Sequence, residues 1–105
     1  MLRIYPVVLS VLEGLQPIVI RIEARDRDLA RQLRRCSSSV ALNLAEGMYS
    51  RGRNRDARYH TALGSARETL ACLEVAAVCR YVPKDAVLFD QLDRVVGTLV
   101  KLTRS

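Results

Sequence analysis

The sequence predicts an all-α protein that folds as an antiparallel, up-down-up-down four-helix bundle. In four separate series, apolar residues recur at alternating spacings of three and four, the period of an amphipathic helix. Only five Gly and three Pro interrupt the 105 residues, too few for a fold with many turns. Half of the residues are hydrophobic, so residues 1–105 are expected to form a single domain around one core.

The first apolar series predicts a helix over residues 4–22. Its members are Ile4, Val8, Val11, Leu15, Ile18 and Ile22. Pro17 is expected to kink or interrupt this helix, because proline removes a backbone hydrogen bond and crowds the preceding turn. Further apolar residues lie off the series, at Val7, Leu12, Val19 and Ile20. A helix that is apolar on more than one side needs more than one set of neighbours, which favours a homo-oligomer.

The second series predicts a helix that begins near Asp26 or Asp28. Either carboxylate can accept hydrogen bonds from the exposed N–H groups of a first turn. The helix is expected to stop at about Gly47. Residues 50–54 are expected to form a basic loop, with Asn54 as a candidate N-cap of the next helix. The apolar members are Leu29, Leu33, Cys36, Val40 and Leu44.

The third and fourth series predict two more helices. The third is roughly 40 Å long and ends before Pro83. The fourth starts near Lys84 or Asp85. Short connections between such helices lead to antiparallel neighbours. The third series comprises Tyr59, Leu63, Ala66, Leu70, Leu73, Ala77 and Tyr81, and the fourth comprises Leu88, Leu92, Val95, Leu99 and Leu102.

The residues needed for catalysis or metal binding are scarce. His60 is the single histidine, and no Glu precedes it by three residues, as a di-iron bundle requires. No Cys and His residues cluster at zinc-ligand spacing, and no glycine-rich phosphate loop occurs. We therefore expect no enzyme activity, no catalytic residue, no metal site and no cofactor, and we expect His60 to be solvated.

The three cysteines favour a reducing compartment. Cys72 and Cys79 are seven residues apart, roughly 10 Å along a helix, which is too far for a disulfide. With Cys36, they are expected to be buried thiols of a cytoplasmic protein. Charged and polar residues interrupt the first apolar series, so no segment of about 20 residues is expected to span a bilayer. The first residues do not resemble a signal peptide, and no membrane partner is expected.

Five polar residues are expected to face one another between the second and third helices. Ser39, Asn43 and Glu46 are spaced to form one stripe, and Ser65 and Glu68 share a face of the next helix. Small residues around them would let the two backbones approach closely. The pattern favours a structural polar layer that fixes the register of the helices. The alternative is a ligand or partner pocket built on Asn43, Glu46 and Glu68.

Positive charge is concentrated in arginine. The net charge is +6, and fifteen Arg stand against two Lys. Nine basic residues fall in two windows, about 30 Å apart by helix rise. The candidate nucleic-acid-binding residues within them are Arg31, Arg34, Arg35, Arg51, Arg53, Arg55 and Arg58. Arginine is suited to phosphate forks, but a protein-binding surface and a solvated face with weak ion pairs are alternatives.

Three motifs carry a family resemblance. They are Gln32-Leu-Arg-Arg-Cys36, Ser39-Val-Ala-Leu-Asn43-Leu-Ala-Glu46-Gly47 and Ala62-Leu-Gly-Ser65-Ala-Arg-Glu68. Together they resemble the bacterial four-helix bundle proteins encoded by intervening sequences inside large-subunit ribosomal RNA genes. The accessory variability determinant of diversity-generating retroelements is a relative of that family. The resemblance covers the second and third helices well and the flanking helices by pattern, and Pro17 departs from it.

The resemblance implies a homopentameric ring with a basic surface. In the retroelement branch it also implies binding of nucleic acid and of a reverse transcriptase. We therefore expect a non-enzymatic oligomeric bundle that binds RNA or DNA largely through backbone contacts, as an accessory factor to a reverse transcriptase. The alternative is a protein–protein adaptor with no nucleic-acid role.

Overall fold

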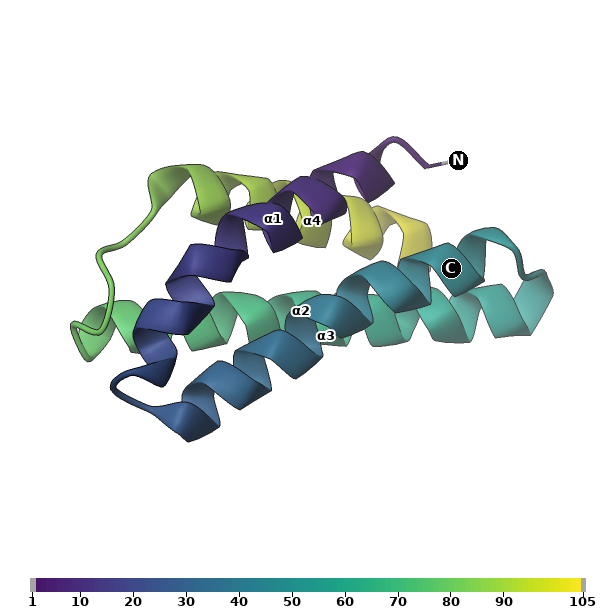
Figure 1. The fold of residues 1–105 in the computed structure, drawn as a ribbon. Coiled ribbons are helices and arrows are strands. Elements are labelled where there is room, and N and C mark those ends of the chain that lie inside the picture. The colour runs from purple at the N-terminus through teal and green to yellow at the C-terminus, as the bar shows by residue number, and fades with distance from the viewer. Residues whose placement is uncertain (1, 105) are drawn as a thin grey trace.

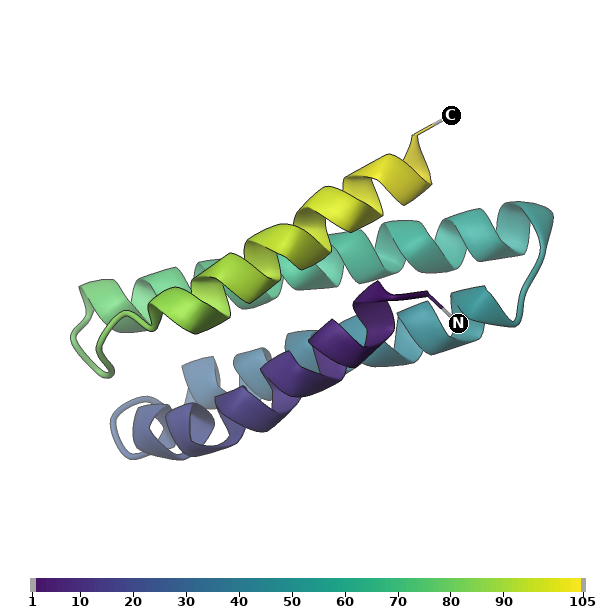
Figure 2. The same cartoon turned by 90° about the horizontal axis from the view of Figure 1, so that it is seen from above.

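The computed structural model describes residues 2–104, which form four α-helices and no strand. The helices are α1 (Ile4–Glu23), α2 (Arg27–Met48), α3 (Gly52–Val78) and α4 (Ala86–Thr103). They lie side by side in an elongated bundle (Figure 1) with extents of 42 × 23 × 21 Å. Seen from above, α1 and α2 form one side of the bundle, and α3 and α4 form the other (Figure 2). The predicted all-α four-helix bundle is confirmed.

Aspartate side chains cap two of the helices. Asp26 precedes α2 and accepts a hydrogen bond from the backbone N–H of Leu29 at 2.9 Å. Asp85 precedes α4 and accepts from the backbone N–H of Leu88 at 3.1 Å. Each cap satisfies a donor that the first helical turn leaves open, and is worth about 1 kcal/mol. Of the alternatives that the sequence left open, the structure selects Asp26 and Asp85.

The start of α3 differs from the prediction. Arg51 occupies the N-cap position, and Gly52, with φ of +58°, opens the helix. Glycine adopts this left-handed conformation without steric cost, so the chain turns into α3 earlier than expected. Asn54 is therefore not the cap. It lies in the first turn, where its side-chain amide donates to Ser50 Oγ at 3.2 Å, and most of the predicted basic loop is helical.

The end of α3 is also earlier than predicted, at Val78 rather than Tyr81. Arg80 adopts a left-handed conformation with φ of 61°. Its N–H donates to Ala77 O at 3.0 Å, and the N–H of Tyr81 donates to Ala76 O at 2.9 Å. This pair of hydrogen bonds closes the helix in a Schellman arrangement. The chain reverses there, and Tyr81 follows the helix rather than extending it.

Helix α1 corrects two expectations. It continues from Ile4 to Glu23 with Pro17 inside it, so of the two predicted effects of the proline, a kink or an interruption, the interruption does not occur. Its length and composition also suffice for a membrane-spanning segment, contrary to the prediction, because the helix holds few charged residues. One face of α1 nevertheless packs into the bundle. The buried residues on that face are Ile4, Val8, Val11, Leu15, Val19 and Ile22.

The apolar residues of α1 outside the predicted series have neighbours within the chain. Val19 is buried in the core, and Val7 and Leu12 pack against it half-buried. Ile20 is 63% exposed. Much of the apolar surface that favoured an oligomer from the sequence is therefore covered by the bundle itself.

The core consists of two apolar clusters. One is centred on Leu15, Leu33 and Leu92, and the other on Leu44 and Leu99. A small cavity lined by apolar side chains of both clusters also holds two buried polar side chains. These are Ser37, whose hydroxyl donates to Leu33 O at 2.6 Å, and Thr69, whose hydroxyl donates to Ser65 O at 2.8 Å. Both hydroxyls are satisfied by their own helix, which limits the cost of burying them.

Helices α2 and α3 approach each other closely at Gly47. A Cβ atom on this residue would lie 2.6 Å from Cδ1 of Tyr59 and closer still to Cε1. Tyr59 is buried, and Ala62 and Ala66 on the same helix are fully buried. Gly47 therefore does more than precede the helix end at Met48. It leaves the space that the Tyr59 ring fills.

We predict that Gly47→Ala destabilises the protein by about 1–2 kcal/mol, because overpacking against Tyr59 outweighs the better helix propensity of alanine. Gly64→Ala is the matched control. Gly64 also lies inside a helix, but its Cβ would meet no atom within 4 Å. That variant should gain up to about 1 kcal/mol. Urea denaturation measures both, and equal stabilisation by the two substitutions would contradict the packing role of Gly47.

Candidate nucleic-acid interface

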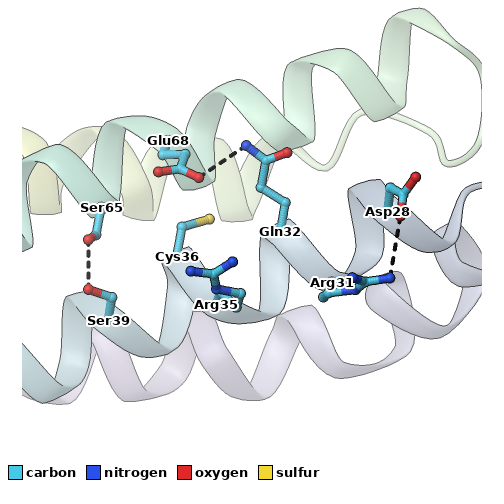
Figure 3. Close-up of a pocket in the computed structure, with 8 residues that line it drawn as sticks. All are labelled: Asp28, Arg31, Gln32, Arg35, Cys36, Ser39, Ser65 and Glu68. Atoms are coloured by element: carbon cyan, nitrogen blue, oxygen red, sulfur yellow. Dashed lines mark hydrogen bonds and ion pairs between the residues drawn. The ribbon is translucent and has the colours of Figure 1, made fainter.

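A groove between α2 and α3 encloses a cavity of about 430 Å³ (Figure 3). Its floor and rims are polar. The lining residues are Asp28, Arg31, Gln32, Arg35, Cys36, Ser39, Ser65 and Glu68. The groove thus unites members of both predicted sets, since Arg31 and Arg35 were expected to bind nucleic acid and Ser39, Ser65 and Glu68 to form the polar layer.

The predicted polar residues join α2 to α3 along the surface of the bundle. Ser65 Oγ donates to Ser39 Oγ at 2.8 Å, and Asn43 Nδ2 donates to Ser39 Oγ at 3.0 Å. Glu68 accepts from Gln32 Nε2 at 3.1 Å (Figure 3). Ser39, Asn43 and Ser65 are half-buried, whereas Glu46 and Glu68 are exposed. The set is therefore a seam at the surface and not a layer through the interior.

The pocket that the sequence suggested as an alternative is only partly present. Glu68 lines the groove, but Asn43 and Glu46 do not. They lie nearer the end of α2 with Arg58, whose guanidinium contacts Glu46 at 2.9 Å and Asn43 Oδ1 at 3.5 Å. One predicted binding arginine is therefore engaged with the polar seam.

Sequence reasoning missed the two polar side chains that are buried, Ser37 and Thr69. Their positions carried a signal, because each falls in register with an apolar series. Ser37 follows Leu33 by four residues, and Thr69 precedes Leu73 by four. A residue in that register faces the core whatever its chemistry.

Two further arginines on α2 are paired with carboxylates. Arg34 contacts Glu23 of α1 at 2.8 Å, and Arg31 contacts Asp28 at 3.4 Å. The Arg34 guanidinium lowers the pKa of the Glu23 carboxyl through its hydrogen bond and its charge. Both pairs are exposed, and such pairs contribute little to stability because water and salt screen them. Another anion can therefore readily replace the carboxylate as the partner of either arginine.

The remaining candidate arginines have few partners. Within residues 2–104, the side chains of Arg35, Arg51 and Arg53 make no hydrogen bond or ion pair, and Arg55 donates from Nε to Ser50 O at 3.0 Å. Arg35 lies in the groove, while the other three surround the connection from α2 to α3. The two basic windows remain at opposite ends of α2, as the sequence indicated.

The thiol of Cys36 lines the groove next to a second cysteine. Thr69 Oγ1 lies 3.3 Å from Cys36 Sγ and 2.8 Å from Ser65 O, so its single hydroxyl proton is shared between these two acceptors. A hydrogen bond from the Cys72 thiol, with that of Thr69, lowers the pKa of Cys36 to about 7 against the opposing effect of burial. The pKa of Cys72 is raised, because its proton is held by Cys36 and its side chain is buried. Cys79, expected to be buried, is exposed.

The described residues offer no metal site. Among residues 2–104, no three His, Cys, Asp or Glu side chains gather in an arrangement that would hold a metal ion. His60 is exposed on α3.

Comparisons with known proteins agree with this fold. The profile of the 23S rRNA-intervening sequence protein family matches residues 19–102. The chain is also similar to the crystal structure of a protein with unknown function from the S23 ribosomal protein family of Bacteroides thetaiotaomicron. The TM-score is 0.86 at 15% sequence identity, over 97% of this chain and 99% of that chain, which is a likeness of fold. No curated protein matches the chain.

We predict that one thiol titrates with an apparent pKa of about 7, measured by the ultraviolet absorbance of the thiolate. Cys72→Ala removes the main donor to Cys36 and should raise that pKa toward the ordinary value of 9.0. Cys79→Ala is the control and should leave the titration near 7 in place. A titration near 7 that persists in Cys72→Ala would contradict this assignment.

Proposed function

This chain belongs to the 23S rRNA-intervening sequence protein family, and from that membership we propose that it is a non-enzymatic bundle that binds RNA through phosphate contacts. The observation that carries the proposal is the group of arginines without acidic partners at the connection from α2 to α3. The association of the family with intervening sequences of ribosomal RNA favours RNA over DNA.

The connection between α2 and α3 presents positive charge to solvent. Arg51, Arg53 and Arg55 are all exposed, and none of them contacts a carboxylate among the described residues. The first turn of α3 adds the partial positive charge of a helix N-terminus. Guanidinium groups form bidentate contacts with phosphate and release counterions when they do so. This end of the bundle is suited to a nucleic-acid backbone.

The other candidate arginines act as a second group. Arg31, Arg34 and Arg58 are held by exposed carboxylates at 2.8–3.4 Å. Binding of phosphate by these residues must first break an ion pair, so each is expected to contribute less than Arg51 or Arg53. We therefore place the first contact with RNA at the α2–α3 connection.

An oligomer would bring the separated basic windows of different copies together. Leu42 is 66% exposed and Tyr49 is 89% exposed. Leu42 lies on α2, and Tyr49 is the C-cap residue two turns further along, so both lie on the same side of this end of the helix. We propose that this face contacts a second copy, in an assembly for which the family resemblance implies a pentameric ring.

Further features of the proposal follow from the short connections and the resemblance. Only a few residues join each helix to the next, which supports an antiparallel up-down-up-down order. The retroelement relative supports an accessory role to a reverse transcriptase. The free thiols support a cytoplasmic location without a membrane partner.

The alternative function is that of a protein–protein adaptor. The exposed face of Leu42 and Tyr49 also favours this role, because exposed aromatic and aliphatic side chains are typical anchors of protein interfaces. In that case the arginines serve contacts with the partner protein. Salt separates the two functions, since phosphate binding weakens steeply as salt rises and an apolar contact does not.

We predict that Arg51→Gln, Arg53→Gln and Arg55→Gln together weaken binding to a labelled structured RNA by at least about tenfold and lower the salt slope by about 2–3. Fluorescence anisotropy from low to physiological salt measures both, with a matched DNA duplex for comparison. The control removes the same charge at three exposed arginines outside the two windows. Its substitutions are Arg21→Gln, Arg67→Gln and Arg94→Gln.

Two outcomes would contradict this function. If the two triple variants bind RNA with equal affinity, the α2–α3 connection contributes only through the net charge of the protein and is not the contact site. An absence of binding by the unaltered protein even at low salt would remove RNA as a partner and leave the adaptor role.

We predict that light scattering gives a multiple of the 11.8 kDa chain mass. Leu42→Ser with Tyr49→Ser should shift the mass toward the monomer, because these side chains lose their apolar contact area. Val78→Ser with Val87→Ser is the control, since both valines are exposed elsewhere on the bundle. A monomer mass for the unaltered protein would contradict self-association.

A further inference from the structure

The groove between α2 and α3 contains one guanidinium group that has no partner among the described residues, that of Arg35. Figure 3 shows the Arg35 guanidinium on the α2 side of the groove, next to Cys36, with the Gln32–Glu68 hydrogen bond above it and the Ser39–Ser65 hydrogen bond further along the groove. Within the described part of the chain, Arg35 makes no hydrogen bond or ion pair of its own. It is therefore available to an anion that enters the groove.

A carboxylate lies on the opposite rim. Glu68 Oε2 accepts from Gln32 Nε2 at 3.1 Å, which leaves Oε1 of Glu68 and the side-chain carbonyl of Gln32 as open acceptors. The hydroxyls of Ser39 and Ser65 close one end of the groove, and Arg31 with Asp28 stands at the other. A complementary ligand must carry an anionic group for Arg35 and, at its other end, neutral N–H donors for Glu68.

We propose that this groove binds a nucleoside phosphate, with the phosphate on Arg35 and the donor edge of a guanine base on Glu68. The proposal rests on the RNA-binding function proposed above and specifies which nucleotide of the RNA would bind in the groove. The cavity of about 430 Å³ falls within the range of about 300–1,000 Å³ that small-ligand sites occupy.

Guanine satisfies the acceptors better than the other bases. Its N1–H and exocyclic N2–H lie side by side and can both donate to one carboxylate. Cytosine and adenine offer only an exocyclic amino group on this edge. Uracil has a single N–H between two carbonyl groups, and a carboxylate repels the oxygens of those carbonyls. A bidentate contact of this kind discriminates between bases by about 5- to 150-fold. The same chemistry is presented by an unpaired guanosine of an RNA loop and by free GMP.

Arg31 can assist phosphate binding in the groove, but the binding does not require it. The side chains of Arg31 and its partner Asp28 are 71% and 93% exposed, and their contact at 3.4 Å is long. Arg31 can therefore turn to a phosphate at little cost. Because Arg35 has no such partner, it is the residue on which phosphate binding depends.

The test titrates GMP, UMP and inorganic phosphate into the protein and follows amide chemical shifts by NMR. We expect GMP to bind at least fivefold more tightly than UMP and to shift residues that line the groove. Glu68→Gln should weaken GMP binding at least fivefold without weakening UMP binding, because the substitution removes the repulsion between the carboxylate and the uracil carbonyls. Arg35→Gln should weaken both nucleotides at least fivefold. Arg94→Gln removes one charge at an exposed residue that does not line the groove, and it should change the binding of neither nucleotide.

The second arm uses RNA hairpins that differ in a single loop residue, unpaired guanosine or uridine. We expect the guanosine hairpin to bind more tightly, and Glu68→Gln to abolish the difference while binding itself persists. If the hairpins bind equally and the groove variants change nothing, the groove proposal is overturned while RNA binding stands. If GMP binds in the groove but no RNA does, the ligand is a free nucleotide and the RNA function fails instead.

Discussion

The close approach of α2 and α3 is the constraint on which the rest of the structure depends. It is possible because Gly47 leaves room for the ring of Tyr59, and the small residues Ala62 and Ala66 are fully buried on the same helix as that ring. At this separation, Ser39 and Ser65 reach each other directly at 2.8 Å. Larger side chains at these positions would hold the helices apart and replace a direct hydrogen bond with water. The other pairs of helices complete the core around this pair.

The same constraint produces the groove. Where the α2–α3 contact consists of short side chains, the long side chains that flank it stand above the surface and enclose space. Arg35, Gln32 and Glu68 are such residues, and Cys36 lies beneath them. The thiol is buried, yet donors from Thr69 and Cys72 favour its charged form. The groove is thus polar at its floor as well as at its rims, which suits a ligand with several hydrogen-bonding groups better than an apolar one.

The sequence allowed the helices to be predicted far better than the roles of individual residues. The apolar periodicity located the four helices of residues 2–104. Simple chemistry offered Asp26 or Asp28 as the cap of α2, whereas Asp85 was expected only as one of two residues near the start of α4. Both ends of α3 were misjudged, because left-handed conformations at Gly52 and Arg80 decided them and no periodicity encodes such a conformation. The polar stripe on α2 and α3 was recognised, but its depth was not, since a helix face that lies at a seam and one that lies in the core have the same spacing. The partners of the arginines depended on Glu23 and Glu46, which only the folded chain brings near them.

The distribution of ion pairs divides the basic surface into two kinds of arginine. Arg34 and Arg58 tie helices together through Glu23 and Glu46, so their charge is largely compensated where it stands. Arg35, Arg51 and Arg53 have no carboxylate within contact distance among residues 2–104, and their charge is directed outward. Exposed ion pairs add little stability, so leaving these three arginines unpaired costs the fold little and leaves their charge uncompensated. The folded chain places these uncompensated cations on one pair of helices, in the groove between them and at the connection at their end, and for this reason the proposed RNA and nucleotide contacts are assigned to these two places.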